Sequence, residues 1–160
     1  METAWINHLA AYQAAMQQQV PHVFRGLMDF MLRFRMRLLA HYPSGYAVSH
    51  LSPGYLDFSY FAFTPETVRQ QKLKVAVVFN HQELRFEIWL CGQNKGVQKE
   101  FWTIFKESDW DKANLAPTPQ RSVLEEILVV VPDFSNEDEL FKSLEAGIMR
   151  FNDMLLAALA

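Results

Sequence analysis

The residues of this chain that could do chemistry gather on two neighbouring stretches, Lys72–Asn80 and Leu84–Gly92. Apolar and polar residues alternate in both, which is typical of strands because successive side chains of a strand point to opposite faces. One face of this predicted hairpin is apolar throughout. The other face combines charged side chains with an indole ring, namely those of Lys74, Arg85, Glu87 and Trp89. Such a surface could bind a charged or aromatic ligand, although it contains no recognised catalytic set.

The register of the hairpin decides which of these side chains meet. A four-residue turn, Asn80–Glu83, predicts the cross-strand pairs Val78–Arg85, Ala76–Glu87 and Lys74–Trp89. If the predicted strand Tyr55–Phe63 is the antiparallel neighbour, Asp57 and Phe61 join the same face. We therefore expect a shallow candidate binding site made of Asp57, Phe61, Lys74, Arg85, Glu87 and Trp89. The alternative is a face of cross-strand ion pairs that is solvated or covered by the N-terminal helix or another subunit.

A second candidate site lies after Gly92, where the spacing of Val97, Phe101 and Ile104 predicts a helix. A projection of about 100° per residue places three lysines and a tryptophan away from that apolar stripe. These residues are Lys95, Lys99, Trp102 and Lys106. Lysines around an indole could contact phosphates and stack on a base. The alternative is a solvated helix face with Trp102 packed on a neighbouring loop, and we do not expect nucleic acid to be a partner.

The sequence lacks the motifs of several common catalytic, metal and cofactor sites. No two of the five histidines form a His-x-x-x-His pair, and Cys91 is the only cysteine, so no metal site is expected. No glycine-rich phosphate loop, dinucleotide fingerprint or nucleophile elbow occurs. We therefore expect no cofactor and assign no catalytic residue, although a small-molecule enzyme without a recognisable signature stays open.

Composition indicates one folded domain in the cytoplasm. Half of the 160 residues are hydrophobic and the net charge is -3, which gives no overall attraction to nucleic acid or anionic membranes. A chain of this length buries roughly 70% of its unfolded surface, so residues 1–160 are expected to form a single domain. The N-terminus lacks the basic start of a signal peptide, and no apolar run approaches the roughly 18 residues of a membrane span. A cytoplasmic protein without a membrane partner is the resulting prediction.

Hydrophobic periodicity predicts the elements that must position these side chains. Two N-terminal helices are expected, one with an apolar stripe from Trp5 to Met16 and one from Pro21 to about Ala40. An antiparallel β-meander that includes the hairpin follows. After it come a helix, the strand Glu126–Val131 and a C-terminal helix. The predicted class is α+β, with the order α-α-β-β-β-β-α-β-α.

Several segments carry a resemblance to other proteins. They are Gly54–Phe58, Tyr60–Pro65, Leu73–Asn80, Arg85–Leu90, Asn94–Lys95, Val97–Gln98 and Trp102. Together they resemble a family of bacterial proteins of unknown function, over most of the chain after Gly45. The resemblance implies no mechanism, because no activity or catalytic residue of that family is assigned.

The order of helix, three strands, helix and strand is also similar to the core of the restriction-endonuclease-like superfamily. That resemblance implies Mg²⁺ held by clustered carboxylates and a Glu-x-Lys motif on a core strand. Here Glu87 is followed by Ile88 and Trp89, and no carboxylate occurs between Lys72 and Asn80. An active nuclease is therefore not expected, whereas a degenerate relative of that fold stays open.

These observations favour a non-catalytic module that binds a partner and self-associates as a homodimer. Its second sheet face or a terminal helix would form the interface. Two alternatives stay open: a divergent restriction-endonuclease-like domain that acts on or binds nucleic acid, and a small-molecule enzyme whose ligand is unknown.

Overall fold

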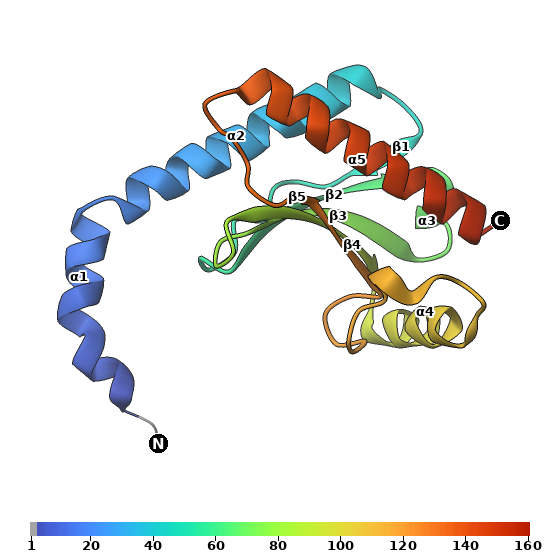
Figure 1. The fold of residues 1–160 in the computed structure, drawn as a ribbon, viewed down its shortest axis with the longest axis horizontal. Helices are drawn as coiled ribbons and strands as arrows, with labels where there is room; N and C mark the ends of the chain where they lie inside the picture. Colours follow the sequence, from blue (N-terminus) through green and yellow to red (C-terminus); the bar gives the residue numbers. More distant parts are fainter. Residues whose placement is uncertain (1–2) are drawn as a thin grey trace.

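A computed structural model describes residues 3–160 of the chain (Figure 1). Its helices are η1 (Ala4–His8), α1 (Leu9–Gln17), α2 (Val20–His41), α3 (Glu66–Arg69), α4 (Lys95–Glu107), η2 (Lys112–Asn114) and α5 (Glu137–Ala158). Its strands are β1 (Tyr46–Val48), β2 (Phe58–Pro65), β3 (Leu73–Asn80), β4 (Arg85–Gly92) and β5 (Leu124–Val129). This order confirms the predicted α+β class, with N-terminal helices, a meander, a helix, a strand and a C-terminal helix.

Within the described residues, five strands form one antiparallel sheet in the order β1-β2-β3-β4-β5. Each strand therefore pairs with its neighbours in the sequence. Figure 1 shows α2 and α5 over one face of the sheet and α4 on the opposite side, near the end of β4. η1 and α1 extend away from the body, so that η1 and the C-terminal end of α5 lie at opposite extremes of the described residues. Among residues 3–160, no helix combines the length and the apolar character that a membrane crossing requires.

The main core lies between the sheet and the two long helices. The rings of Phe30 and Phe34 on α2 lie 5.0 and 5.4 Å from the ring of Phe141 on α5. Phe34 also approaches Phe61 of β2, with 6.3 Å between the ring centroids. Burying a large apolar side chain of this kind contributes about 1.5–3 kcal/mol. The aromatic side chains therefore fix α2 and α5 on this face of the sheet.

Ion pairs join α2 to α5 on the solvent side of this core. Arg33 Nη2 lies 2.6 Å from Glu137 Oε1, and Arg37 Nε lies 3.3 Å from Glu145 Oε2. The Arg33–Glu137 pair is exposed and contributes only about 0–1 kcal/mol, whereas the Arg37–Glu145 pair is largely buried. Both pairs fix the position of α2 against α5.

The predicted faces of the hairpin are correct, but its predicted register is wrong by two residues. The observed pairs are Val78–Glu87, Ala76–Trp89, Lys74–Cys91 and Asn80–Arg85. The turn contains His81–Leu84 rather than Asn80–Glu83, because Asn80 Oδ1 accepts hydrogen bonds from the backbone N–H groups of Gln82 and Glu83. Leu84 then takes a left-handed conformation, with φ of 52°. A shift of two residues keeps every side chain on its predicted face.

The predicted facing of β2 is also wrong. Phe61 pairs with Val77 and is fully buried under α2, whereas Tyr60 pairs with Val78 and lies on the opposite face. The strand begins at Phe58 and not at Tyr55, because the preceding loop carries Leu56 in a left-handed conformation with φ of 63°. Phe61 therefore belongs to the main core and does not share a face with Trp89.

Candidate functional site

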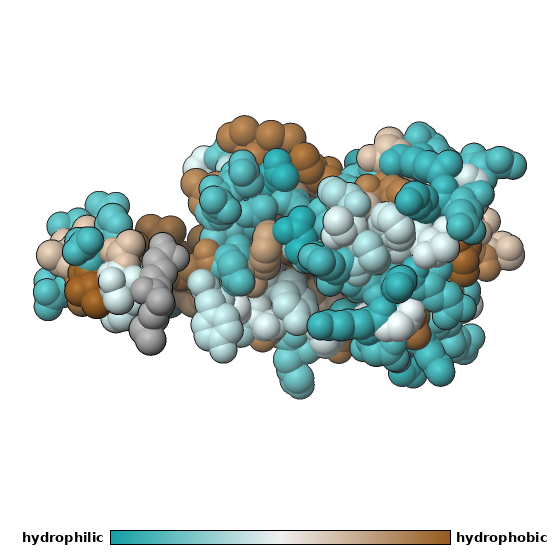
Figure 2. All heavy atoms as spheres, turned by 90° about the horizontal axis from the view of Figure 1, so that it is seen from below, coloured by the Kyte–Doolittle hydropathy of each residue, from teal (hydrophilic) through white to brown (hydrophobic). Residues whose placement is uncertain are grey.

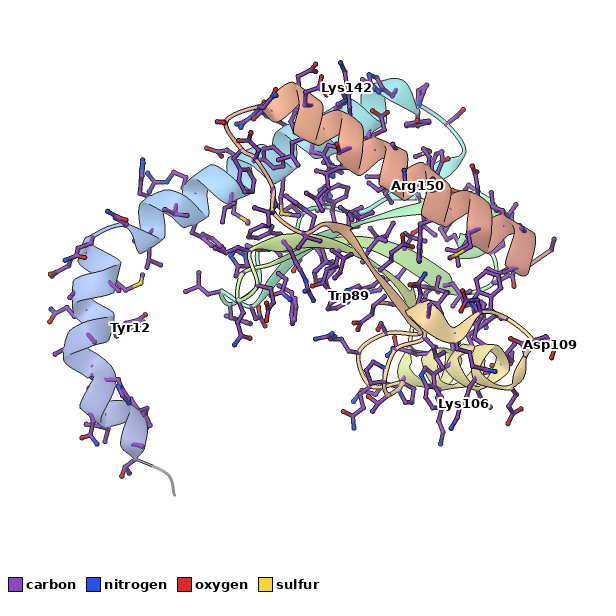
Figure 3. All side chains as sticks on the ribbon, viewed as in Figure 1. Tyr12, Trp89, Lys106, Asp109, Lys142 and Arg150 are labelled. Atoms are coloured by element: carbon purple, nitrogen blue, oxygen red, sulfur yellow. The ribbon has the colours of Figure 1, made fainter. Side chains whose placement is uncertain are left out.

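The face of the sheet that α2 and α5 leave uncovered carries its own small cluster of side chains. We call it the second sheet face and define it by Phe58, Tyr60, Lys74, Ala76, Val78, Arg85, Glu87, Trp89 and Cys91. Figure 3 shows Trp89 on this side of the sheet, pointing away from α2 and α5. Ala76, Val78, Trp89 and Cys91 are buried there, and the half-buried rings of Phe58 and Tyr60 pack against them. This face is therefore built as a packed surface and not as a fully solvated one.

Glu87 is the centre of a hydrogen-bond network on this face, although only 3% of it is exposed. Its Oε2 accepts from Asn80 Nδ2 and Arg85 Nε, both at 2.9 Å, and its Oε1 accepts from Trp89 Nε1 at 2.9 Å. Burial alone would raise the pKa of this carboxyl, but the three hydrogen bonds and the Arg85 charge outweigh burial and lower the pKa. Glu87 is thus an ionised, fully bonded group that orients the Trp89 indole.

Arg121 covers part of this face from the segment that precedes β5. Its guanidinium carbon lies 4.5 Å from the centroid of the Trp89 ring and 5.0 Å from that of Phe58. Glu125 holds the guanidinium through two hydrogen bonds of 3.0 and 2.9 Å. Sequence reasoning missed Arg121, because it lies in a proline-containing segment without periodicity. Only the fold brings Arg121 over Trp89, which lies 32 positions earlier in the chain.

A cavity of about 180 Å³ opens between β2, β3, β4, α4 and the Arg121 segment. It is lined by Tyr60, Lys74, Ala76, Trp89, Cys91, Gln98 and Arg121. Within residues 3–160, no carboxylate oxygen lies within 4.0 Å of Lys74 Nζ, which instead lies 5.8 Å from the centroid of the Tyr60 ring. Lys74 is therefore a positive charge at this cavity that has no carboxylate partner among the described residues.

The thiol of Cys91 is placed for packing and not for reaction. Burial raises its pKa to about 11, although the nearby charges of Lys74 and Arg121 act to lower it. A nucleophilic cysteine needs the thiolate near neutral pH. Cys91 therefore forms an apolar wall of the cavity.

Asp57 lies outside the second sheet face. It occupies the loop before β2, where its Oδ1 accepts hydrogen bonds from the backbone N–H groups of Tyr55 at 2.9 Å and Phe58 at 2.7 Å. These bonds lower its pKa. Of the six residues in the predicted site, the structure therefore brings Lys74, Arg85, Glu87 and Trp89 onto one face and places Asp57 and Phe61 elsewhere. That these four residues bind a ligand remains a prediction.

The predicted basic and aromatic patch on α4 is only partly free. Trp102 is half buried and donates its indole N–H to the carbonyl of Ala116 at 2.8 Å, so it packs on the neighbouring loop. Lys106 Nζ lies 4.9 Å from the centroid of the Trp102 ring, while Lys95 and Lys99 are exposed. This geometry agrees with a solvated helix face whose tryptophan anchors a loop. A contact of these lysines with phosphates stays a prediction.

The N-terminal segment forms a second candidate site. We call Ala4–Gln17 the arm; none of its residues is buried. Five of them expose large apolar side chains, namely Trp5, Ile6, Leu9, Tyr12 and Met16. Figure 2 shows brown apolar side chains on this protruding segment beside polar ones.

A groove of about 750 Å³ lies where the arm meets α2 and the loop before β2. We call it the elbow groove; it is lined by Tyr12, Met16, Val20, Pro21, Phe24, Arg25, Met28, Gly54, Tyr55 and Leu56. Tyr55 is 94% exposed beside it, and Leu84 of the hairpin turn is 60% exposed nearby, at a second groove lined by Val20, Phe24 and Leu56. The sequence predicted helices in this region. It did not predict that the apolar side chains of the arm would stay exposed in their own chain.

Across residues 3–160, no group of three or more histidine, cysteine, aspartate or glutamate side chains is arranged to hold a metal ion.

Comparison with known proteins assigns the chain to a family. No curated protein and no solved structure matches it, so the similarity to the restriction-endonuclease-like fold is not confirmed. A family model does match, over residues 6–159, and its description is "Domain of unknown function (DUF7000)". This match covers nearly the whole chain and confirms the expected resemblance to an uncharacterised family. The chain belongs to the DUF7000 family.

Proposed function

We propose that this protein is a non-catalytic interaction module that forms a homodimer by placing the arm of each copy on the elbow groove of the other. The observation that carries this proposal is an apolar helical arm in which none of residues 4–17 is buried. The outer part of the arm, with Trp5, Ile6 and Leu9, would present the binding side chains. The elbow groove, to which Tyr12 and Met16 of the receiving copy contribute, would accept them.

The arm needs a partner in order to stay helical. It has only fourteen residues, five of them in a 3-10 helix, and isolated helices shorter than about 12–15 residues are marginal in water. Its own body gives it little support, because Figure 1 shows its N-terminal half standing clear of the sheet and the other helices. Contact with another surface would supply the missing stabilisation.

Charge favours a protein as that partner. No lysine, arginine, aspartate or glutamate occurs between Thr3 and Phe24. Helices that lie on membrane surfaces carry basic residues on their polar face, and nucleic acid binding depends on lysine and arginine contacts to phosphates. The arm has neither, so its exposed rings and aliphatic chains fit an apolar protein surface.

The exposed apolar area matches what a stable dimer needs. The side chains concerned are Trp5, Ile6, Leu9, Tyr12, Met16, Val23, Tyr55, Leu56 and Leu84, with exposed fractions between 37% and 94%. If a large side chain presents about 150–250 Å² when free, these fractions correspond to roughly 1,000 Å² per chain. A stable interface buries about 800 Å² per partner. The arm and the elbow groove, together with Val23 and Leu84 beside it, therefore carry enough surface.

The backbone conformations of two leucines support an interaction role. Leu56 lines the elbow groove and Leu84 lies beside it. Leu56 and Leu84 have φ of 63° and 52°. Left-handed conformations are rare for large apolar residues and are strained. Both side chains are nevertheless exposed, at 48% and 60%. A fold that keeps strained leucines facing outward is expected where these side chains meet a partner.

A second copy is the occupant that these surfaces favour. The same chain carries both halves of the contact, an apolar stripe and an apolar groove, at the same end of the molecule. A two-fold axis between two such ends would exchange the arms and give two identical contacts. The second sheet face is less suited as the interface, because Arg121 already covers Trp89, which is 7% exposed.

Light scattering of the unaltered protein tests this proposal. One chain has a mass of 18.6 kDa, and the dimer is expected to show twice that value at about 10 µM, since interfaces of this size reach micromolar or tighter affinity. A mass of one chain at about 100 µM would overturn the proposal, because a dissociation constant weaker than that range would leave the arm uncovered.

A further inference from the structure

We propose that the cavity on the second sheet face binds a small, flat organic carboxylate about the size of benzoate. Lys74 would bind the carboxylate, and the rings of Tyr60 and Trp89 would hold the flat part. This inference does not depend on the homodimer, because the cavity lies on the second sheet face and not at the arm or the elbow groove.

The size of the cavity limits its ligand. Its volume is about 180 Å³. A protein cavity of about 150 Å³ can hold benzene. A ligand of about nine or ten non-hydrogen atoms therefore fits, whereas a nucleotide or a sugar phosphate does not.

The charges at the cavity leave one positive group without a counterion. Arg121 is held by two hydrogen bonds to Glu125, and Arg85 is held by Glu87. Each of these pairs is close to neutral. Lys74 is half buried, and within residues 3–160 it has no carboxylate within 4.0 Å. The cavity therefore presents a single unpaired ammonium group, which suits a ligand with one negative charge.

A carboxylate suits this arrangement better than a phosphate. Phosphate sites commonly use the fork of an arginine or several backbone N–H groups together. Here the fork of Arg121 is occupied by Glu125. One ammonium group can instead form a charge-assisted hydrogen bond with one carboxylate oxygen.

The walls of the cavity are fixed before any ligand arrives. Trp89 is held by its hydrogen bond to Glu87 and by the Arg121 guanidinium over its ring. Gln98 accepts a hydrogen bond from the backbone N–H of Gly92 at 3.2 Å and donates one to the carbonyl of Pro119 at 2.7 Å. Gly92 has no side chain to keep α4 away, since a Cβ there would overlap the backbone of Gln98. Fixed walls reduce the entropy that binding loses.

Nuclear magnetic resonance of the ¹⁵N-labelled indole groups tests this inference with benzoate as the probe. The chain has four tryptophans, so Trp5, Trp102 and Trp110 serve as internal controls for Trp89. We expect benzoate to shift the Trp89 indole signal in a saturable way, with a dissociation constant of about 1 mM or tighter. Benzamide, which has the same shape but no charge, is expected to bind at least about 10-fold more weakly.

Substitution of Lys74 provides the second part of the test. Lys74→Met keeps most of the stem, removes the charge, and is expected to weaken benzoate binding about 10-fold or more. Lys99→Met removes an exposed charge on α4 and is expected to leave binding unchanged. The inference is overturned if benzoate does not saturate the Trp89 shift, if benzamide binds equally well, or if both lysine variants behave alike. The benzamide comparison uses the unaltered protein, so it decides the matter even if Lys74→Met fails to fold.

Discussion

Glutamate in place of both Trp5 and Tyr12 is expected to convert the proposed homodimer into monomers. Both side chains are more than 60% exposed on the arm, and the dimer would bury them. An aromatic anchor at the centre of an interface contributes about 2–4 kcal/mol, so loss of two raises the dissociation constant roughly 1,000-fold or more. Sedimentation velocity at about 10 µM should then show a particle with the mass of one chain.

The matched control places the same charges on the other side of the arm. Asn7 and Ala14 have the same spacing of seven residues as Trp5 and Tyr12, and both are exposed. Asn7→Glu with Ala14→Glu adds the same net charge and should leave the dimer intact, because these positions point away from the apolar stripe. If both double variants dissociate, charge on the arm rather than the stripe controls assembly. If neither dissociates, the arm is not the interface.

Replacement of Glu87 by alanine is expected to destabilise the fold by about 3–5 kcal/mol, the usual effect of removing one partner from a buried ion pair. The variant would leave the Arg85 charge, the Trp89 indole N–H and the Asn80 amide without their acceptor. Urea denaturation at pH 7 measures this loss, at one fixed protein concentration because a dimer's stability depends on concentration. The expected result is a lower midpoint of unfolding.

Glu66→Ala is the matched control for this variant. Glu66 also pairs with an arginine, Arg69, at 3.2 Å, but both side chains of that pair are about half exposed. An exposed pair contributes about 0–1 kcal/mol, so this variant should unfold close to the unaltered protein. Equal losses in both variants would show that Glu87 is not the centre of a buried network.

The pH dependence of stability gives an independent test of Glu87. Its pKa is lower in the folded protein than in the unfolded chain. Its contribution is therefore complete above the unfolded pKa of about 4.3, and it is lost as the pH falls through the folded pKa. The stability difference between the unaltered protein and Glu87→Gln should thus be largest near neutral pH and shrink under acid conditions. A difference that grows toward acid pH would mean that Glu87 is protonated in the folded state.

The hairpin shows which parts of the fold could be predicted from the sequence. Alternation alone assigned Lys74, Glu87 and Trp89 to one face, because a strand has a period of two. Their partners could not be assigned, since a shift by two residues preserves that alternation. The register depended on Asn80, whose side chain accepts bonds from the turn, and on the left-handed Leu84. Sequence patterns give little warning of a leucine in that conformation.

β2 shows why the face on which Phe61 lies was predicted wrongly. Aromatic side chains occur at both even and odd positions of this strand, at Phe58 and Tyr60 and at Phe61 and Phe63. Alternation could therefore not decide which set enters the main core. The answer came from α2, which packs Phe34 toward Phe61. Arg121 was invisible for a related reason, because a loop without periodicity brought it over Trp89.

The arm shows a different limit. The spacing of its apolar residues predicted helices, and the helices are present. An apolar stripe has the same pattern whether its partner belongs to its own chain or to another one. Only the structure could show that residues 4–17 bury none of their side chains within this chain.

The most direct measurement is a photo-crosslink from the far end of the arm. A benzophenone amino acid in place of Trp5 would be mixed with ¹⁵N-labelled chains that lack it, irradiated, and analysed by mass spectrometry. Trp5 lines a hollow together with His8, Leu9 and Tyr12 of the arm, and Figure 1 shows the N-terminal half of the arm clear of the sheet and the other helices. A crosslink beyond the arm is therefore expected to reach another copy. We expect an adduct of two chains that joins the probe to a labelled peptide from residues 20–28, 54–56 or 81–84. Crosslinks confined to the arm, or directed to the second sheet face, would contradict docking of the arm on the elbow groove.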